Sequence, residues 1–303
     1  MIPEISVVIP VYKGQDSIAP LVSMLHEELN AVSFEVILVV DGCPADSDSV
    51  CRKLAQDFEN VNYVSLRKNF GEFNAVICGL NYVNGKYAVI IDDDFQNPPS
   101  EIIKLYNHAK KGDYDVVYSY YVTKEHAAYR NWGSQLVNYL TTYLLKKDKD
   151  LYLSSFKLIK KEVVNEITRY KTPYPYIDGM IFHVTNRIGK VQVVHKERAH
   201  GVSNYTFSKL VNLFLVILFG YSMIPLRLTL FGGIFSIISS VIYMGLYFVD
   251  LIPEWGSPVI IFLGGILMCT IAILGEYMGK TYMIISGLPQ YVIREKNIKP
   301  YVD

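Results

Sequence analysis

The sequence predicts an α/β fold with a mostly parallel, doubly wound sheet, followed by two membrane-spanning helices. Short apolar runs alternate with segments of helical spacing as far as Ser119, a pattern typical of a parallel sheet covered by helices. Acidic residues follow two of these runs, at Asp41 and at Asp92 to Asp94. Two long segments without charge, 228–249 and 257–275, lie near the C-terminus, and such segments favour membrane helices over a soluble core.

The individual strands and helices are predicted from apolar spacing and from the residues that end each run. The predicted strands are 5–11, 34–40, 61–66, 87–91 and 115–119. The predicted helices are 17–30, a segment from the capping residues Asp46 and Ser47 to about Phe58, 74–83 and 100–110. In such a sheet both acidic positions fall at the carboxyl ends of strands, where ligands bind.

The two uncharged segments have the length of membrane spans. At 1.5 Å per residue, 228–249 covers roughly 33 Å and 257–275 roughly 28 Å, against a hydrocarbon thickness of about 30 Å. The link between them contains Trp255 and no Lys or Arg. The basic residues of the outer flanks are Lys209, Arg227, Lys280, Arg294, Lys296 and Lys299. Positive charge on both flanks predicts a multi-pass protein of the cell (inner or plasma) membrane with a cytoplasmic N-terminal domain. The alternative is a buried helical hairpin of a soluble fold.

The segment 206–225 is apolar but ends at Pro225. We expect an amphipathic helix in the membrane interface, with a third span or a core helix as alternatives. The predicted organisation is therefore a cytosolic domain 1–205, this interfacial helix, two spans within 226–282, and a cytosolic tail 283–303. The pair Gly264-Gly265 would permit close helix contact and hence a homo-oligomer.

Composition narrows the class of protein. The chain has 29 basic and 29 acidic residues, so its overall charge indicates no nucleic-acid partner. Its four cysteines form no C-x-x-C pair, which indicates reduced thiols without a disulfide framework or a zinc site. The N-terminus is interpreted as a strand and not as a signal peptide. His183, His195 and His200 lack metal-ligand spacing and are interpreted as ordinary polar residues.

The D-x-D spacing of Asp92 and Asp94 after an apolar strand predicts a site for Mg²⁺ or Mn²⁺. Hard divalent ions prefer carboxylate oxygens and keep positions open for substrate phosphates. A bound ion would neutralise a diphosphate leaving group. An acidic triplet alone is a weak signal, and the strand before it and Phe95 to Pro99 after it make it more specific.

Several segments together resemble the family-2 glycosyltransferases of the GT-A fold, and more narrowly the polyisoprenyl-phosphate glycosyltransferases, such as dolichol-phosphate mannose synthases and bacterial undecaprenyl-phosphate sugar transferases. The matching segments are SVVIPVYKGQDSI (6–18), VILVVDGCPADS (36–47), RKNFGEFNAVICGL (67–80), VIIDDDFQNPP (89–99), ERAHGVSNYTFSKL (197–210) and LGEYMGKTY (274–282). The last two are specific to the narrower group, because the others occur across family 2.

The resemblance implies roles for individual residues. The nucleotide-binding residues would be Pro10, Tyr12, Asp41, Lys68, Asp92 and Asp93, with Asn69 and Gly71 nearby. Asp41 would accept from the base, or alternatively be a turn residue before Gly42. The acceptor phosphate would contact Lys157, Arg198, Ser203, Tyr205 and Lys209, and Asp92 and Asp94 would hold the metal. Catalysis would involve Asp94, Asp178 and Arg198. The alternatives are a surface charge for Arg198 and a turn or cap residue for Asp178.

One departure from the family pattern bears on the acceptor. Many relatives carry an Asp, sometimes proposed as a base, in a G-D-F-R-like segment, where this chain has Ser155 and Lys157. A phosphate monoester is largely dianionic at neutral pH, with a second pKa of about 6, and needs little help from a base, whereas a sugar hydroxyl needs one. The resemblance and the missing carboxylate therefore predict inverting transfer from a nucleotide sugar, UDP first, to polyprenyl (undecaprenyl) phosphate at the cytosolic face of the bilayer.

Two alternatives stay open. One is a membrane glycosyltransferase that adds a sugar to a hydroxyl of a lipid-linked glycan, although the chain lacks the Q-x-x-R-W motif of processive synthases. The other is an inactive membrane scaffold, which the Ser155 change favours and the intact Asp92-x-Asp94 pair disfavours.

Overall fold

The computed structural model divides into two compact units, Met1–Tyr205 with Pro289–Asp303, and Thr206–Leu288. The residues it describes are 2–43, 46–121, 142–143, 147–172, 175–196, 215, 218–219, 222–249 and 256–300.

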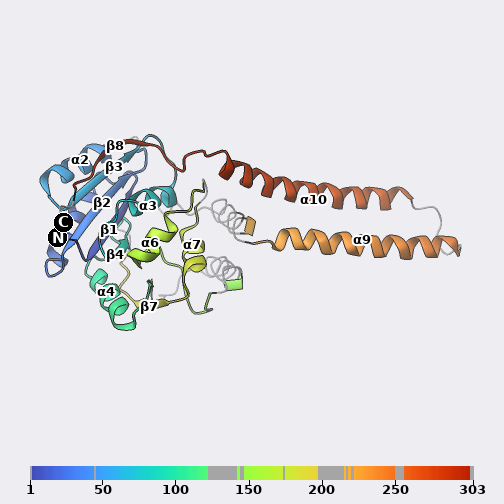
Figure 1. Cartoon of the computed structure of the whole chain (residues 1–303), viewed down its shortest axis with the longest axis horizontal. Coiled ribbons are helices and arrows are strands. Elements are labelled where there is room, and N and C mark those ends of the chain that lie inside the picture. The colour runs from blue at the N-terminus through green and yellow to red at the C-terminus, as the bar shows by residue number, and fades with distance from the viewer. Residues whose placement is uncertain are drawn as a thin grey trace. The chain divides into compact units, whose positions relative to one another are not determined.

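The first unit is built on a mixed sheet (Figure 1). In the described part of the chain the strand order is β7-β5-β6-β4-β1-β2-β3-β8. Neighbouring strands from β4 to β3 and the pair β5–β7 are parallel, while β6 is antiparallel to β4 and β5, and β8 is antiparallel to β3. The strands are β1 Ile5–Val11, β2 Phe34–Val40, β3 Val61–Leu66, β4 Tyr87–Ile90, β5 Val116–Tyr120, β6 Lys157–Lys160, β7 Ile188–Gln192 and β8 Ile293–Asn297.

Helices cover both faces of the sheet and give it two cores. Alternate residues of β1 enter different cores: Val7 and Ile9 pack with α1, α2 and α4, whereas Val8 packs with α3, α6 and α7. This is the period-two pattern of a strand buried on both sides. A Cβ at Gly79 of α3 would overlap Val8, so the helix lies directly on the strand. The helices are α1 Ile18–Glu28, α2 Ser47–Asp57, α3 Glu72–Leu80, α4 Glu101–Gly112, α6 Lys161–Ile167 and α7 Ile177–Val184.

The predicted strands and helices of the first 120 residues are present, and their ends differ from the predicted ones by at most three residues. The structure adds β8 in the segment that sequence analysis described only as a tail. Arg52 Nη2 lies 2.6 Å from Glu295 Oε2, and the hydroxyl of Tyr291 accepts from Asn81 Nδ2 at 3.1 Å. The chain after the apolar helices therefore belongs to the same folded unit as the N-terminal strands.

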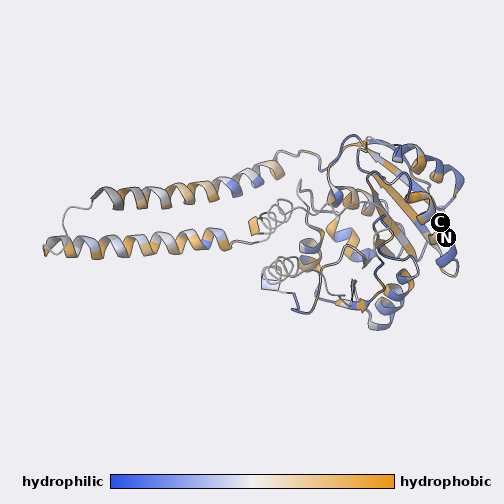
Figure 2. Ribbon diagram, turned by 180° about the vertical axis from the view of Figure 1, so that it is seen from behind, coloured by the Kyte–Doolittle hydropathy of each residue, from blue (hydrophilic) through white to orange (hydrophobic). Residues whose placement is uncertain are grey.

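The second unit contains α9 Ile224–Phe248 and α10 Gly256–Ile285, which are apolar over most of their length (Figure 2). Ile224–Tyr243 and Phe262–Ile285 are long and apolar enough to cross a membrane, and only 6% and 0% of an 18-residue apolar stretch within each are buried. Large side chains such as Phe231 and Met268 are 65% and 68% exposed. The described residues thus give no packed core around the helices, contrary to the buried-hairpin alternative, and such exposed apolar surface needs a cover such as lipid.

Two details of this unit differ from or extend the prediction. α10 continues beyond residue 275 to Ile285 and carries an ion pair, Lys280 Nζ to Glu276 Oε1 at 3.5 Å. Pro225 lies in the first turn of α9, where its missing N–H removes no helical hydrogen bond. Most of the expected interfacial helix 206–225 lies outside the described residues.

Candidate active site

Asp41 follows β2 and joins two loops at the carboxyl edge of the sheet. Its carboxylate is 3% exposed and accepts from the backbone N–H of Phe70 at 2.7 Å and of Gly71 at 2.9 Å. Burial raises the pKa of Asp41, and these two hydrogen bonds oppose that shift. The observed bonds give Asp41 a loop-holding role in addition to the base contact that the resemblance implies.

Gly42 brings the loops after β2 and β3 into contact. Its φ of +55° lies in the left-handed region, and a Cβ there would overlap the backbone of Lys68 and Asn69. Lys68 Nζ lies 5.1 Å from the centroid of the Phe70 ring. In the neighbouring loop, Tyr12 is 44% exposed. Pro10 pairs in register with Val39 of β2. The structure therefore brings the loops that carry the predicted nucleotide-binding residues to one edge.

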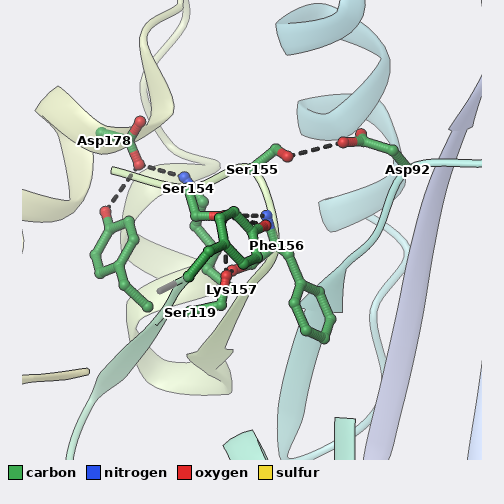
Figure 3. Close-up of polar contacts among 9 residues, drawn as sticks. Asp92, Ser119, Ser154, Ser155, Phe156, Lys157 and Asp178 are labelled. Atoms are coloured by element: carbon green, nitrogen blue, oxygen red, sulfur yellow. Dashed lines mark hydrogen bonds and ion pairs between the residues drawn. The ribbon is translucent and has the colours of Figure 1, made fainter. Parts of the chain in front are cut away.

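The acidic residues follow β4 at the same edge. Asp92 Oδ2 accepts from Ser155 Oγ at 2.7 Å (Figure 3), and Asp94 Oδ1 accepts from the backbone N–H of Gln96 at 3.1 Å. Ser155, at the position where the family resemblance led us to expect Asp, thus orients a carboxylate instead of offering one. A neutral hydroxyl donates to an ionised carboxylate here, so Asp92 keeps its negative charge in this hydrogen bond.

Asp93 lies against the loop after β1. A Cβ at Gly14 would overlap its Oδ2, and this atom is buried without a hydrogen-bond partner among the described residues. Burial, and then the charges of Asp92 and Asp94, raise the pKa of Asp93 to about 7. The three adjacent carboxyl groups therefore repel one another when they are ionised, and a bound cation would stabilise their ionised forms.

The donor set fits an open divalent-cation site. Within the described ranges no group of three His, Cys, Asp or Glu side chains is arranged to hold a metal ion by itself. Asp92 and Asp94 supply two carboxylates, and Mg²⁺ in enzymes is commonly bound by one or two carboxylates together with water and substrate phosphates. The residues therefore suit an ion that binds together with a diphosphate, and not a closed structural site.

Lys157 and Asp178, predicted separately as phosphate ligand and catalytic carboxylate, form a buried ion pair (Figure 3). Their side chains are 4% and 9% exposed. Asp178 Oδ1 also accepts from the Tyr118 hydroxyl at 2.8 Å, and burial followed by the Asp178 charge raises the pKa of Tyr118. Asp178 lies in the first turn of α7, where the helix dipole favours a negative charge. Each partner thus already has a counter-charge.

Sequence analysis missed a second group of polar contacts beside the acidic residues. This group of contacts joins the loop after Asp94 to the ends of β5 and β7 and to the segment before β6. Its members are Gln96, Asn97, Ser119, Tyr121, Ser154 and His195. The available signal was the position of Gln96 and Asn97 directly after the D-x-D motif, and His195 gave none. Arg198, Ser203, Tyr205 and Lys209 lie outside the described residues.

Comparisons with known proteins bear on the family and the fold of the chain. Residues 6–168 of the 303 match the family described as glycosyl transferase family 2. An undecaprenyl-phosphate 4-deoxy-4-formamido-L-arabinose transferase of Edwardsiella ictaluri (strain 93-146) is 29% identical over 303 residues, covering 96% of this chain and 93% of the relative. The transferase of the same name from Enterobacter sp. (strain 638) is 28% identical over 304 residues, with the same coverage.

Among solved structures, glucosyl-3-phosphoglycerate synthase from Mycobacterium tuberculosis, crystallised with Mn²⁺, UDP-glucose and phosphoglyceric acid, matches with a TM-score of 0.55. It is 18% identical, and the match covers 72% of this chain and 78% of that one. At this identity the likeness concerns the fold.

Proposed function

The chain belongs to glycosyltransferase family 2, and from that premise we propose that it transfers a sugar from a nucleotide donor to a polyprenyl phosphate at a membrane surface. The observation that carries the proposal is the presence of an exposed apolar hairpin in the same chain as the acidic site. The similarity to undecaprenyl-phosphate sugar transferases extends over 96% of the chain and so includes this hairpin.

The topology of the chain supports a single membrane side for the catalytic unit. The segments before and after the two apolar helices belong to one compact unit. Both segments must therefore lie on the same side of the membrane, and a chain that crosses the membrane twice meets this requirement. The positive flanks favour the cytoplasm as that side, where nucleotide sugars are available. We propose a multi-pass inner or plasma membrane enzyme on this basis.

The proposed reaction is a single displacement. An oxygen of the acceptor phosphate bonds to the anomeric carbon of the sugar, the bond from that carbon to the diphosphate breaks, and the nucleoside diphosphate leaves with the electron pair, which inverts the anomeric centre. A divalent ion, Mg²⁺ or Mn²⁺, held by Asp92 and Asp94, would supply positive charge to the leaving diphosphate. Arg198, with Ser203, Tyr205 and Lys209, would bind the acceptor phosphate.

The surroundings of Asp92 support a phosphate acceptor. Ser155 donates to Asp92 at 2.7 Å, so the position proposed as a base in relatives offers no carboxylate. Asp178 is buried and paired with Lys157, which makes it a poor base for a sugar hydroxyl. A dianionic phosphate attacks without a base, and the apolar helices raise the local concentration of a water-insoluble acceptor. Asp41 and the loop that it holds would position the nucleotide, with UDP as the first candidate.

A lipid-product assay tests the proposal. The purified full-length chain is incubated in detergent with undecaprenyl phosphate, Mn²⁺ or Mg²⁺, and a panel of labelled UDP-, dTDP- and GDP-sugars that includes 4-deoxy-4-formamido-L-arabinose. We expect a labelled lipid that disappears with EDTA and in Asp94→Ala. Asp57→Ala, an exposed position at the end of α2, is the matched control and keeps activity. Transfer to a glycan hydroxyl with no lipid product from any donor would refute the proposal.

A further inference from the structure

The loop Phe95 to Asn97, directly after the acidic residues, has a strained start. Phe95 has a φ of 61°, a left-handed conformation that bulky residues rarely adopt. This turn brings the backbone N–H of Gln96 back to Asp94 Oδ1 at 3.1 Å, so the loop conformation and the orientation of the Asp94 carboxylate are linked. Such strain persists only where surrounding contacts hold it.

The segment after β7 holds one side of this loop. The backbone N–H of Lys196 donates to the carbonyl of Gln96 at 2.9 Å. The side chain of Gln96 meets His195, with 3.3 Å between the two Nε2 atoms. Either the amide donates to the ring nitrogen or, with the amide turned over, its oxygen accepts from the ring N–H. In both cases the imidazole holds the side chain of Gln96, the residue whose backbone N–H donates to Asp94.

Tyr121 holds the other side and supports the imidazole. Its ring centroid lies 4.1 Å from that of His195. Its hydroxyl donates to Asn97 Oδ1 at 2.8 Å and lies 3.1 Å from Ser154 Oγ. Ser154 is the neighbour of Ser155, which donates to Asp92 (Figure 3). The contacts of Tyr121 therefore extend from the loop after Asp94 to the residue that orients Asp92.

We propose that His195, packed against the Tyr121 ring, is a positioning residue that fixes the loop 95–97 and, through it, the Asp94 carboxylate for binding a divalent cation together with a nucleoside diphosphate. This inference rests on the proposed function and assigns His195 and Tyr121 no contact with the reacting atoms. The chain continues from His195 to Arg198 within three residues, so the same segment that holds the cation loop leads into the proposed phosphate-binding segment.

The test measures metal binding without turnover. The full-length protein in detergent is titrated with Mn²⁺ in the presence of UDP, and free Mn²⁺ is followed by electron paramagnetic resonance. His195→Phe keeps a ring on Tyr121 but loses the bond to Gln96. Because loss of an outer-shell partner typically costs 10–100-fold in metal affinity, we expect Mn²⁺ affinity to fall by roughly 10-fold or more with an unchanged unfolding temperature. His195→Gln, which returns an amide near the position of Nε2, should restore part of it.

His108→Phe is the matched control, since His108 stacks on Tyr114 with 5.2 Å between centroids and lies in α4. Its Mn²⁺ affinity should equal that of the wild type. In the lipid-product assay, His195→Phe should raise the Mn²⁺ concentration for half-maximal rate while kcat at saturating Mn²⁺ recovers. A purely structural role would lower stability and leave this metal dependence unchanged.

A second variant covers the case in which His195→Phe does not fold. Tyr121→Phe keeps the ring that contacts His195 and removes only the hydroxyl contacts to Asn97 and Ser154, and it should also weaken Mn²⁺ binding. Unchanged Mn²⁺ affinity in the folded variants, together with its loss in Asp94→Ala, would overturn the inference and leave the proposed function intact. A wild-type protein that forms labelled lipid but binds no Mn²⁺ would overturn both the cation site and the positioning role.

Discussion

Replacing Lys157 by Met leaves the Asp178 carboxylate buried without its counter-charge. The two side chains are 4% and 9% exposed, so solvent cannot replace the lost ammonium group. Breaking a buried pair from one side typically costs 3–5 kcal/mol. We expect about 3 kcal/mol, at the low end, because the Tyr118 hydroxyl still donates to Asp178 and the first turn of α7 still favours a negative charge.

A double variant separates the cost of breaking the pair from the value of the pair itself. In Lys157→Met with Asp178→Asn, no buried charge remains, and the amide oxygen can accept from Tyr118 as the carboxylate does. The free energy of unfolding should therefore recover to within about 1 kcal/mol of the wild type. Urea unfolding of the full-length chain in detergent, followed by near-ultraviolet circular dichroism, gives the free energy of unfolding of the wild type, of each single variant and of the double variant.

The same variants decide whether Lys157 binds substrate. If the pair is structural, the double variant keeps the wild-type KM for polyprenyl phosphate. If Lys157 leaves Asp178 to bind the acceptor, the double variant has a raised KM despite its recovered stability. Arg169→Met is the control, since Arg169 and its partner Glu166 are 76% and 52% exposed, and the loss of this exposed pair should cost less than about 1 kcal/mol. Equal stabilities of Lys157→Met and the wild type would refute the argument from burial.

Four further predictions follow from the site and the core. The pKa of Asp93 is raised from 3.8 to about 7 in the folded protein. Without metal, the stability that the protonated Asp93 carboxyl contributes is therefore fully present below about pH 4 and is lost as the pH rises through 7. Unfolding temperatures in EDTA should therefore show Asp93→Asn gaining on the wild type across that range, and Mn²⁺ should reduce the difference. Gly42→Ala should lower the unfolding temperature and raise the donor KM, because its φ is +55° and the new Cβ overlaps the loop at Lys68. Ser155→Asp should shift the acid limb of the pH–rate profile to higher pH, because it places another carboxyl group beside Asp92, which the Ser155 hydroxyl contacts at 2.7 Å. Glu35→Gln should lower the free energy of unfolding by about 2–3 kcal/mol without changing KM, because the buried Glu35 accepts from Ser6, Asn62 and Asn84 far from the acidic edge.

Each of these has an outcome that contradicts it. A constant difference between Asp93→Asn and the wild type from pH 4 to 7 would show that Asp93 does not titrate in that range. A Gly42→Ala protein with native donor KM would contradict the close approach of the two loops. An unshifted profile in Ser155→Asp would show that this side chain does not reach Asp92. A changed donor KM in Glu35→Gln would show that the opposite ends of the sheet are coupled.

The parallel part of the sheet was predictable because its signals are local. Runs such as Val36 to Val40 are long, apolar and followed by a turn residue, and alternating helices imply parallel pairing. β6 and β8 were missed for the opposite reason. Both are short and contain charged residues, and β8 pairs with β3 across more than 200 residues of intervening chain. Nothing in a local apolar pattern reports a partner at that distance.

The site likewise has some features that the local sequence predicts and others that depend on distant parts of the chain. Asp92 and Asp94 were predictable, since a D-x-D after an apolar strand lies at the ligand-binding edge wherever the loops go. The bonds from Ser155 to Asp92 and from His195 to Gln96 depend on loops that approach from far along the chain, and no spacing encodes them. Lys157 and Asp178 were predicted separately as a phosphate ligand and a catalytic carboxylate, and their pairing with each other is visible only in three dimensions.

The return of the chain to the sheet after α10 has a consequence for how the catalytic unit is held. Lys299 donates to the carbonyl of Phe58 and, through its backbone N–H, to Asn62 Oδ1 at 2.9 Å, and Asn62 in turn donates to the buried Glu35 at 3.0 Å. The C-terminal segment thus contributes to the same buried polar network as β2 and β3. A protein cut before α9 would lose these contacts and expose the edge of β3, which is an unfavourable state for a strand rich in apolar residues. The acidic site is therefore connected to the apolar helices through the chain on both sides of them, as the proposed transfer from a soluble donor to a lipid acceptor requires.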